Sequence, residues 1–410
     1  MTTTRSAPVR PMLVLAVLFV GAFVMGCAEM LVVGLLDLIA ADLEVSVPAA
    51  GALVTANAVG QAFGGPLLTL LATRFDRRRV LLATLIVFVL VYLLPVIGAD
   101  YSVFFISRVI VGAVQGLFIA AAMVMAITVV PPGRSGRAMA VIITGFAAAS
   151  AVGLPLGTLL GQAVGWRAAF AVVVAVALVI LVVAAIVLPS VPTPHESHAV
   201  GQARFAFAPR VVAVLVLAAL IFTGIQSAVT YLVPFLAEVT DVSGPPVGVY
   251  LLTYGVATTV GSFVGGRFAD ANAGRALVVG AMGVTASLTA MFVFGANPLV
   301  VAIAVLGIGL FGMSTAPSLQ HRVVSLSGPG APLAASLPAS AVNVGIAGGS
   351  FAGGVAIDAA GISAAVLTGA IVAAVSVVVA WATSFLKPVA AAASTPAPSG
   401  ASNVRPIDKR

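Results

Sequence analysis

Basic side chains occupy every second gap between the long apolar runs of this 410-residue chain. All nineteen Lys and Arg residues except Arg108 and Arg167 lie in these alternate gaps or in the two terminal segments. The runs cover approximately residues 12–38, 49–72, 80–98, 101–130, 137–162, 166–188, 210–237, 246–268, 276–295, 298–320, 332–357 and 362–386. Each can cross a hydrocarbon core of about 30 Å as a helix that rises about 1.5 Å per residue. Because loops rich in Arg and Lys stay in the cytoplasm, we expect twelve membrane-spanning helices with both termini on the cytoplasmic side.

The composition excludes a soluble globular protein. Hydrophobic residues make up 61% of the chain and charged residues 8%, which is too little charge to cover the surface of a soluble domain. The net charge of +7 marks membrane edges rather than one basic face, so we expect no nucleic-acid partner. The single cysteine, Cys27, excludes an intramolecular disulfide, and the three histidines do not cluster, so we expect no metal site.

A polar stretch with several prolines divides the runs into two sets of six. We predict an N-terminal six-helix bundle over residues 1–189, a cytoplasmic linker over 190–209 and a C-terminal six-helix bundle over 210–387. The tail, residues 388–410, is rich in Ala, Ser and Pro and is predicted to be disordered. No gap reaches the roughly 50 residues of a small domain, and no phosphate-binding loop precedes a lysine, so we expect neither an enzyme nor an ATP-driven pump.

The two halves carry similar signatures at corresponding places. The fifth run contains Gly145, Gly153, Pro155, Gly157 and Gly161, and the eleventh contains Asn343, Gly345, Gly348, Gly349, Gly353 and Gly354. Small residues at these spacings let membrane helices approach closely. Repeated halves of this kind are typical of secondary transporters.

Several motifs together resemble those of one transporter family. They are Met25 to Met30 with Gly34 in the first helix, Arg108 with Gly112 and Gly116 in the fourth, and Gly153 to Gly157 followed by Gly165 to Phe170. The pattern resembles the major facilitator superfamily, and within it the twelve-span drug/proton antiporters that include bacterial chloramphenicol exporters and sugar efflux permeases. The resemblance implies an all-α membrane protein with two pseudo-symmetric six-helix bundles.

The resemblance also implies a function. We expect a proton-coupled exporter of small lipophilic compounds, of the multidrug or phenicol type, that works by alternating access in the plasma (inner) membrane. Its partners would be a small-molecule substrate and the lipid bilayer, its coupling ion a proton, and its state a monomer without other cofactors. Sugar or nucleoside efflux is the alternative within transport, and a non-transporting membrane receptor is the alternative of another class.

Charged residues inside the apolar runs are candidates for proton coupling. A charge in hydrocarbon costs about 2.5 to 3.5 kcal/mol on insertion scales, so it persists where it lines water or finds a partner. Glu29 lies about 13 Å and Arg108 about 10 Å from the outer ends of their helices, so the two lie at similar depth. The resemblance places both at the central cavity, where a carboxylate can bind and release a proton; a permanent structural ion pair is the alternative. Asp37, about 80° round a continuous helix from Glu29, is a second proton candidate or an interfacial residue.

Two further groups of residues complete the predicted site. Uncharged polar side chains that can contact substrate, or equally bond a neighbouring helix, are Asn57, Gln61, Gln115, Gln226, Tyr231, Tyr254 and Asn343. The resemblance assigns a conformational role to Arg74, Asp76, Arg77, Asp270, Arg275, Gly153, Pro155 and Gly157. Thr69, Thr73 and Asp76 stand where the family has Gly, Asp and Gly, so Asp76 among its arginines is expected to replace the family's charge latch. Membrane anchoring of those arginines is the alternative.

Overall fold

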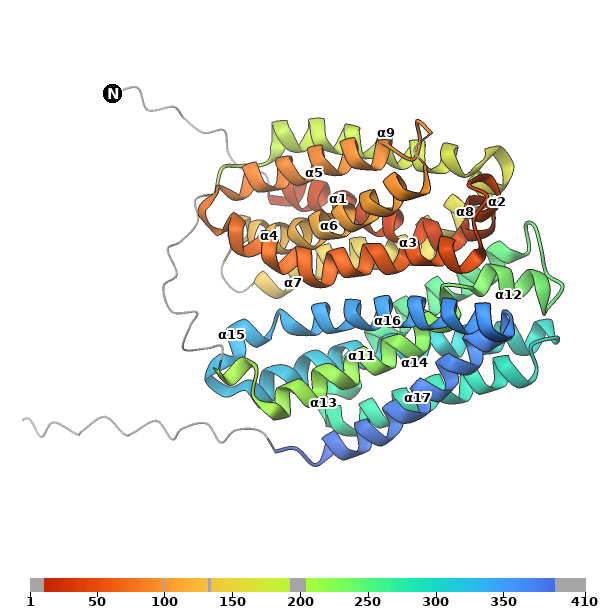
Figure 1. Ribbon diagram of the computed structural model, residues 1–410. Helices are drawn as coiled ribbons and strands as arrows, with labels where there is room; N and C mark the ends of the chain where they lie inside the picture. Colours follow the sequence, from red (N-terminus) through yellow and green to blue (C-terminus); the bar gives the residue numbers. More distant parts are fainter. Residues whose placement is uncertain (1–10, 99, 132–133, 192–203, 388–410) are drawn as a thin grey trace, which may run out of the picture.

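A computed structural model describes residues 11–98, 100–131, 134–191 and 204–387, which are almost entirely helical (Figure 1). The first half contains α1 (Pro11–Gly34), α2 (Leu36–Asp42), α3 (Val47–Val59), η1 (Gly60–Gly64), α4 (Gly65–Leu71), η2 (Ala72–Arg74), α5 (Arg77–Leu93), α6 (Tyr101–Val129), α7 (Ser135–Ala148), η3 (Ala149–Gly153), α8 (Leu154–Val164) and α9 (Trp166–Val187). The second half contains α11 (Pro209–Val229), α12 (Leu232–Glu238), α13 (Val247–Val293), α14 (Pro298–Ser327), η4 (Gly328–Gly330), α15 (Ala331–Ala334), α16 (Leu337–Ala360) and α17 (Ser363–Ser384). Most of the predicted linker, residues 192–203, and the predicted tail lie outside the described residues.

All twelve predicted runs correspond to helical segments of the described chain. Ten helices are long and apolar enough to cross a membrane, or eleven when α2 and Val47–Arg74 are counted as one bent span. The remaining run, 80–98, forms the 17-residue helix α5, which ends at Leu93. Long α13 contains two spans, because the backbone of Asn272 (φ −163°, ψ 89°) is not helical and separates them. The chain is therefore a multi-pass membrane protein.

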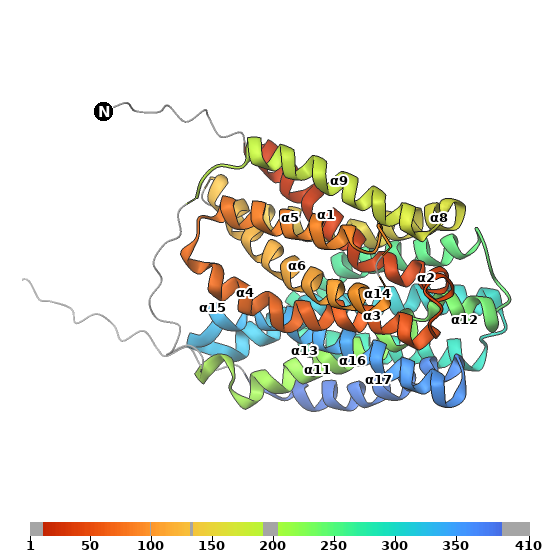
Figure 2. The same cartoon turned by 45° about the horizontal axis from the view of Figure 1, so that its top comes forward.

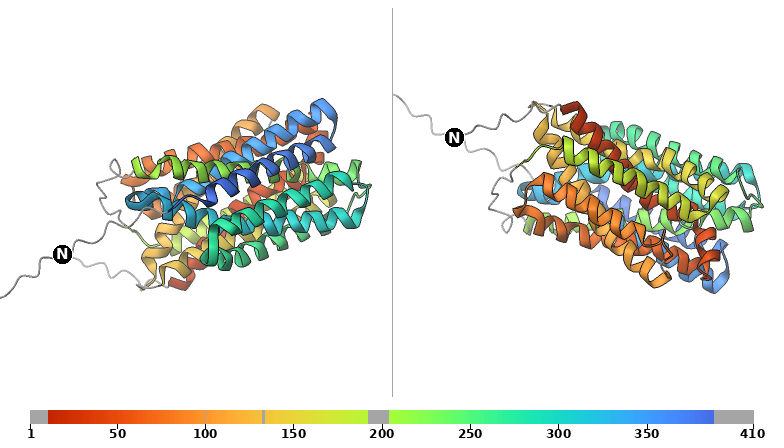
Figure 3. Two further views of the ribbon diagram at one scale, coloured as in Figure 1. Left: turned by 90° about the horizontal axis from the view of Figure 1, so that it is seen from below. Right: turned by 90° about the horizontal axis from the view of Figure 1, so that it is seen from above.

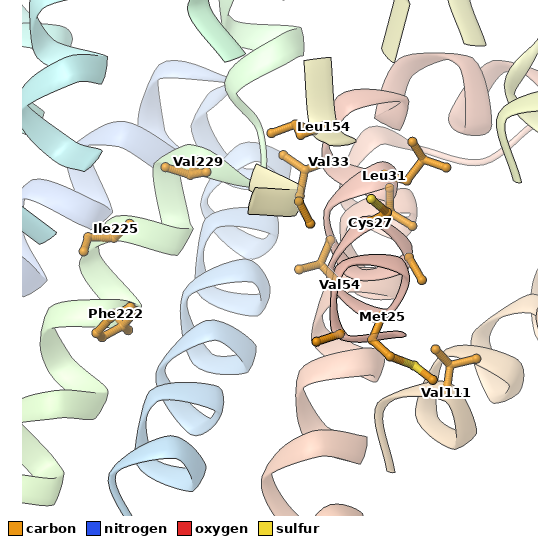
Figure 4. Close-up of a cluster of buried hydrophobic side chains, with 14 of the residues drawn as sticks. Met25, Cys27, Leu31, Val33, Val54, Val111, Leu154, Phe222, Ile225 and Val229 are labelled. Carbon is orange, nitrogen blue, oxygen red and sulfur yellow. The ribbon is translucent and has the colours of Figure 1, made fainter. Parts of the chain in front are cut away.

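The helices form two bundles side by side, one from α1 to α9 and one from α11 to α17 (Figures 1 and 2). Views from below and above show the long helices of both bundles running roughly along one direction (Figure 3). One cluster of buried apolar side chains draws on both bundles, with Met25, Leu31 and Val111 from the first and Phe222 and Ile225 from the second (Figure 4). The site described below lies where the bundles meet.

The glycine rows of the two halves make equivalent contacts. A Cβ atom added at Gly153, Gly157 or Gly161 of the fifth span would collide with Cys27, Leu31 or Leu35 of the first. In the second half, a Cβ at Gly345, Gly349 or Gly353 would collide with the backbone of Ala219, Thr223 or Ser227. Four-residue spacing on both partners keeps one face of each helix against the other over several turns. The fifth span therefore packs on the first as the eleventh packs on the seventh.

The first and seventh spans break near their C-terminal ends, which the predicted continuous runs did not include. Leu35 (φ −120°, ψ 18°) separates α1 from α2, and Tyr231 (φ −107°, ψ 21°) separates α11 from α12. The prediction that Asp37 continues the helix of Glu29 is therefore wrong, and its calculated rotation does not apply. The first break directly follows Gly34, and the second precedes Pro234, which has no N–H to donate to the carbonyl of Thr230. A helix-weakening residue therefore lies within one turn of each break.

Candidate functional site

Glu29 forms the centre of a buried polar cluster between the two bundles. Its side chain lies in α1 and is only 6% exposed. One carboxylate oxygen, Oε2, accepts a hydrogen bond of 2.8 Å from Nε2 of Gln61. Gln61 lies in η1, a single π-helical turn within the second span. Such turns widen the helix locally and are frequent at functional sites.

Two further amides extend the cluster within the first half. Oε1 of Gln115, from α6, accepts hydrogen bonds from Nδ2 of Asn57 at 3.0 Å and from Nε2 of Gln61 at 3.3 Å. The Nε2 atom of Gln115 donates to the backbone carbonyl of Met25 at 2.7 Å. Three of the predicted polar candidates are thus brought together with Glu29 by α1, α3, η1 and α6.

Asn343 joins this cluster from the opposite half. Its Nδ2 atom, on α16, donates to Oε1 of Gln61 at 2.9 Å and to the carbonyl of Ala339 at 3.0 Å. The Oδ1 atoms of Asn343 and of Asn57 are buried and have no hydrogen-bond partner. Two acceptors are therefore free beside a bond that crosses from one bundle to the other.

Arg108 is fully buried but does not form the salt bridge with the Glu29 side chain that a permanent structural ion pair, the alternative to proton coupling, would require. Its guanidinium donates to backbone carbonyls instead: Nη1 to Ala28 at 2.8 Å, Nε to Leu53 at 3.3 Å and Nη2 to that of Glu29 at 3.4 Å. In this conformation the arginine fastens α6 to α1 and α3. The guanidinium still lies near enough to Glu29 to act electrostatically on its carboxylate.

Asp37 lies apart from this cluster, on α2. With Gln162 and Ser243 it supplies polar groups to a mostly apolar pocket of about 580 Å³ between α2, α8 and α12. Glu238 of α12 lies near enough to interact electrostatically with Asp37. The helices that line this pocket, α2, α8 and α12, lie at the end of the molecule opposite α15 (Figure 1). The structure therefore puts the two predicted acidic candidates in different places.

The predicted candidates of the second half are less closely involved. Gln226 is buried and donates to the Thr230 hydroxyl within its own helical region at 3.0 Å. The Tyr231 hydroxyl donates to the carbonyl of Ser350 at 2.8 Å and packs against Gly51. Tyr254 of α13 lies near enough to Glu29 for an electrostatic interaction. Of the three, Tyr254 is the one placed beside the polar cluster.

A seam of close contacts joins the halves between this cluster and the pocket. Ser350 Oγ of α16 donates to the carbonyl of Gly51 of α3 at 2.9 Å, and Thr55 Oγ1 donates to the carbonyl of Ala347 at 3.4 Å. A Cβ added at Gly255 of α13 would collide with the backbone of Ser150 and Ala151 in η3. The backbones of the two bundles thus lie in direct contact at this seam.

Asp76, predicted to act in a charge latch, caps α5. Its Oδ1 atom accepts hydrogen bonds from the N–H groups of Arg78 at 3.0 Å and Arg79 at 3.2 Å, and Oδ2 accepts one from the Ser190 hydroxyl at 2.5 Å. Partial burial raises the pKa of Asp76, but hydrogen bonds from Ser190 and these N–H groups outweigh that effect and leave the pKa below its usual value. The Asp76 carboxylate therefore holds the start of α5 to the end of the sixth span.

The other members of the predicted conformational motif are spread over both halves. Arg74 is exposed, and the N–H of Arg77 donates to the carbonyl of Val191 at 3.2 Å. The N–H of Arg275 donates to Oδ1 of Asn272 at 3.0 Å, whereas the side chain of Asp270 lies outside what the structure describes. Pro155 starts α8 beside Gly153 and Gly157, which lie against α1. The role of these residues in conformational change stays a prediction.

Sequence reasoning missed several residues at the interface between the halves. Ser350 follows Gly349 in a row of small residues, so a polar residue within a close-packed row was the available signal. Nothing in the sequence marks Gln162 and Ser243 as neighbours of Asp37. Within the described ranges no group of three or more His, Cys, Asp or Glu side chains can hold a metal ion.

Comparisons with known proteins give one consistent family. The model of the Major Facilitator Superfamily matches residues 18–331. The chain is 32% identical over 369 residues to "Uncharacterized MFS-type transporter YtbD" of Bacillus subtilis, a match that covers 88% of this chain and 92% of that protein. It is 29% identical to "Chloramphenicol resistance protein" of Streptomyces lividans, with 82% and 86% covered, and 26% identical to "Probable sugar efflux transporter" of Helicobacter acinonychis, with 83% and 87% covered.

A solved structure shows the same fold. The crystal structure of a bacterial homologue of the human lysosomal transporter Spinster, in an inward-facing and occupied conformation, superposes with a TM-score of 0.77 at 15% identity. The match covers 93% of this chain and 97% of that one.

Proposed function

Because the chain belongs to the Major Facilitator Superfamily, a family of transporters rather than enzymes, we propose that it exports small lipophilic compounds in exchange for protons. The observation that carries this proposal is Glu29, an acidic side chain buried between the bundles and hydrogen-bonded to Gln61, which is bonded in turn to the opposite half. A carboxylate in such a place is costly to keep, which makes it a functional candidate. Its protonation is the proposed coupling step.

The chemistry of the cluster favours a lipophilic substrate with few polar groups. Gln61 and Gln115 use most of their capacity on Glu29, on each other, on neighbouring amides and on a backbone carbonyl. Oδ1 of Asn57 and Oδ1 of Asn343 are buried acceptors without a hydrogen-bond partner. We propose that a substrate donates one or two hydrogen bonds to these oxygens while its apolar body lies against the surrounding aliphatic side chains. The relative named for chloramphenicol resistance is consistent with this class.

Sugar efflux is the second candidate, supported by relatives named as sugar efflux transporters. A sugar carries many hydroxyl groups and needs a dense set of polar partners, as ligand sites match the polarity of what they bind. Two free acceptors in the cluster fit a sugar less well than a lipophilic compound. A receptor without transport is the third reading, and it gives no reason for a buried carboxylate linked to both bundles.

We propose that the protein lies in the plasma membrane, with both termini and the basic loops in the cytoplasm. The end that carries α2, α12 and the 580 Å³ pocket then faces outward. The seam between the polar cluster and that pocket would be the closed outer gate. Alternating access would require this seam to open while the cytoplasmic ends come together.

A proteoliposome experiment tests the proposal. Purified protein is reconstituted, a proton gradient is imposed, and uphill movement of chloramphenicol and of a panel of lipophilic dyes is measured, with lactose as the sugar probe. We expect gradient-driven movement of lipophilic compounds by the wild-type protein, and none by Glu29→Gln, which keeps the size and the hydrogen bond but cannot exchange a proton. Equal pumping by Glu29→Gln would remove Glu29 from the coupling step, and Asp37→Asn would then be tested. Movement of lactose alone would favour the sugar alternative.

A further inference from the structure

We infer that Gln61 is a positioning residue that relays the protonation state of Glu29 to Asn343 on the opposite half. The inference rests on the proposed function, because it assumes that Glu29 exchanges a proton. Gln61 contacts both ends of the path: its Nε2 atom bonds Oε2 of Glu29 at 2.8 Å, and its Oε1 atom accepts from Nδ2 of Asn343 at 2.9 Å. One primary amide thus joins a carboxylate of the first bundle to a helix of the second.

The ionised carboxylate fixes the direction of every bond in this path. A carboxylate only accepts hydrogen bonds, so Gln61 must turn its NH₂ group toward Glu29. Its carbonyl oxygen then faces the second bundle, where only a donor can meet it. Asn343 supplies that donor and is held in this orientation by its second bond, to the carbonyl of Ala339. The bond between the halves is therefore compatible with an ionised Glu29.

Protonation of Glu29 changes which group of the Gln61 amide the carboxyl can bond. A carboxylic acid carries an O–H donor, which is best met by the carbonyl oxygen of Gln61. If the amide turns to accept it, its NH₂ group faces the NH₂ group of Asn343, and two donors repel. Asn343 can turn its free Oδ1 toward Gln61 only by giving up its bond to Ala339. If the neutral acid instead keeps its carbonyl oxygen toward Gln61, that oxygen accepts a weaker hydrogen bond than the carboxylate does. In each case protonation weakens the path from Glu29 through Gln61 to α16.

The local backbone suits this role. Gln61 lies in the π-helical turn η1, where the backbone of Gly60 approaches Val109 of α6 so closely that a Cβ would not fit. Other charged or titratable groups near Glu29 are Arg108 of α6, Tyr254 of α13 and, beside Arg108, Tyr92 of α5. Gln61 is the neighbour that hydrogen-bonds both to the Glu29 carboxylate and to the second bundle.

The test measures how far apart the outer ends of the bundles lie as the pH changes, in ligand-free protein. Spin labels are attached to cysteines at Ala41 and Ala296, two exposed positions on the first and second bundle, in a Cys27→Ala background. Double electron–electron resonance in lipid nanodiscs then measures the distance between the two labels from mildly basic to mildly acidic pH. The short-distance population gives the fraction of molecules in which the seam is closed. In wild-type protein we expect acid to lower the ratio of closed to open molecules about threefold, as for loss of one bond between membrane helices.

Four single variants and one double variant separate the relay from a general structural effect. Gln61→Leu and Asn343→Leu each remove the bond between the halves and should abolish the pH response, and the double variant should respond no differently from either single one. Glu29→Gln should also abolish it. The matched control is Gln320→Leu, which removes a glutamine that bonds the carbonyl of Ala335 within the second half and should keep the full response. If Gln61→Leu does not fold, Asn343→Leu tests the same bond from the other side.

The outcomes distinguish failure of the relay from failure of the proposed function. A pH response that needs Glu29 but survives in Gln61→Leu or Asn343→Leu overturns the relay and leaves proton coupling intact. A response that survives in Glu29→Gln, or a wild-type protein with no response, removes Glu29 as the proton site and the relay with it. Asp37→Asn then shows whether the pocket carboxylate produces the remaining response.

Discussion

Changing Ser350 to alanine should open the seam between the bundles by a predictable amount. The Ser350 hydroxyl is fully buried and donates to the carbonyl of Gly51 at 2.9 Å, across the seam. Its own carbonyl, which accepts from the Tyr231 hydroxyl, is unaffected by the change. Ser350→Ala therefore removes one bond between the halves and leaves the rest of the seam in place.

The magnitude follows from that single bond. Hydrogen bonds between membrane helices are worth about 0.6 kcal/mol on average and about 1.7 kcal/mol at most. A carbonyl oxygen has two lone pairs, so Gly51 keeps an intrahelical donor and no unsatisfied group adds to the cost. The ratio of closed to open molecules should thus fall about threefold, and at most roughly eighteenfold. We expect the threefold change in the ratio rather than the larger one, because the alanine leaves no polar group without a partner.

The assay is the distance measurement between labels at Ala41 and Ala296. Thr55→Val removes a longer bond, 3.4 Å to the carbonyl of Ala347, and should shift the populations less. Ser376→Ala is the matched control, because that hydroxyl bonds only the carbonyl of Ala373 in its own helix. An unchanged distribution in Ser350→Ala, or an equal shift in Ser376→Ala, would show that the hydroxyl does not hold the seam.

Three other predictions concern separate features. Arg108→Lys keeps the charge but not the planar fork that reaches several carbonyls, so it should lower the melting temperature and the transport rate, and equal values for wild type and variant would contradict the structural role. Asp76→Ala should loosen the start of α5 by about 1 kcal/mol at neutral pH, measured by hydrogen exchange at the Arg78 and Arg79 amides. Since the pKa of Asp76 is lowered on folding, this difference should be fully present above about pH 4 and shrink as the pH falls through the lowered value; a difference that is unchanged in acid would contradict it. Cysteines placed within residues 190–209 should react with an impermeant thiol reagent only from the cytoplasmic side, and labelling from outside would reverse the orientation.

The sequence predicts the spans and the close packing of helices well, because both depend on local patterns. Apolar runs of sufficient length form helices in lipid wherever they occur, since their backbone groups must be bonded internally. The glycine row from Gly153 to Gly161 predicts a close contact because absent side chains leave room for a neighbour, and that neighbour is the first span. The family resemblance is confirmed by the match over residues 18–331.

The sequence predicted most residues of the buried polar cluster, but not which of them bond to one another. Glu29, Gln61, Gln115, Asn57 and Asn343 were all named as polar residues in apolar runs, and they meet. Which of them bond depends on the rotation of each helix and on the register between bundles, and no local pattern encodes either. Opposite charge at similar depth left a structural ion pair between Arg108 and Glu29 open as an alternative, but Arg108 donates to backbone carbonyls of α1 and α3 instead.

The glycines of the seam set limits on how this protein can change over evolutionary time. Gly51 faces the Tyr231 hydroxyl and Gly255 faces the backbone of Ser150, so even one methyl group at either position would hold the bundles apart. No salt bridge crosses the seam within the described ranges, where the one ion pair, Arg167 with Asp42, stays inside the first half. Lineages living in different salt concentrations can therefore vary their surface charges without altering the seam, whereas Gly51 and Gly255 should tolerate no substitution in a working transporter.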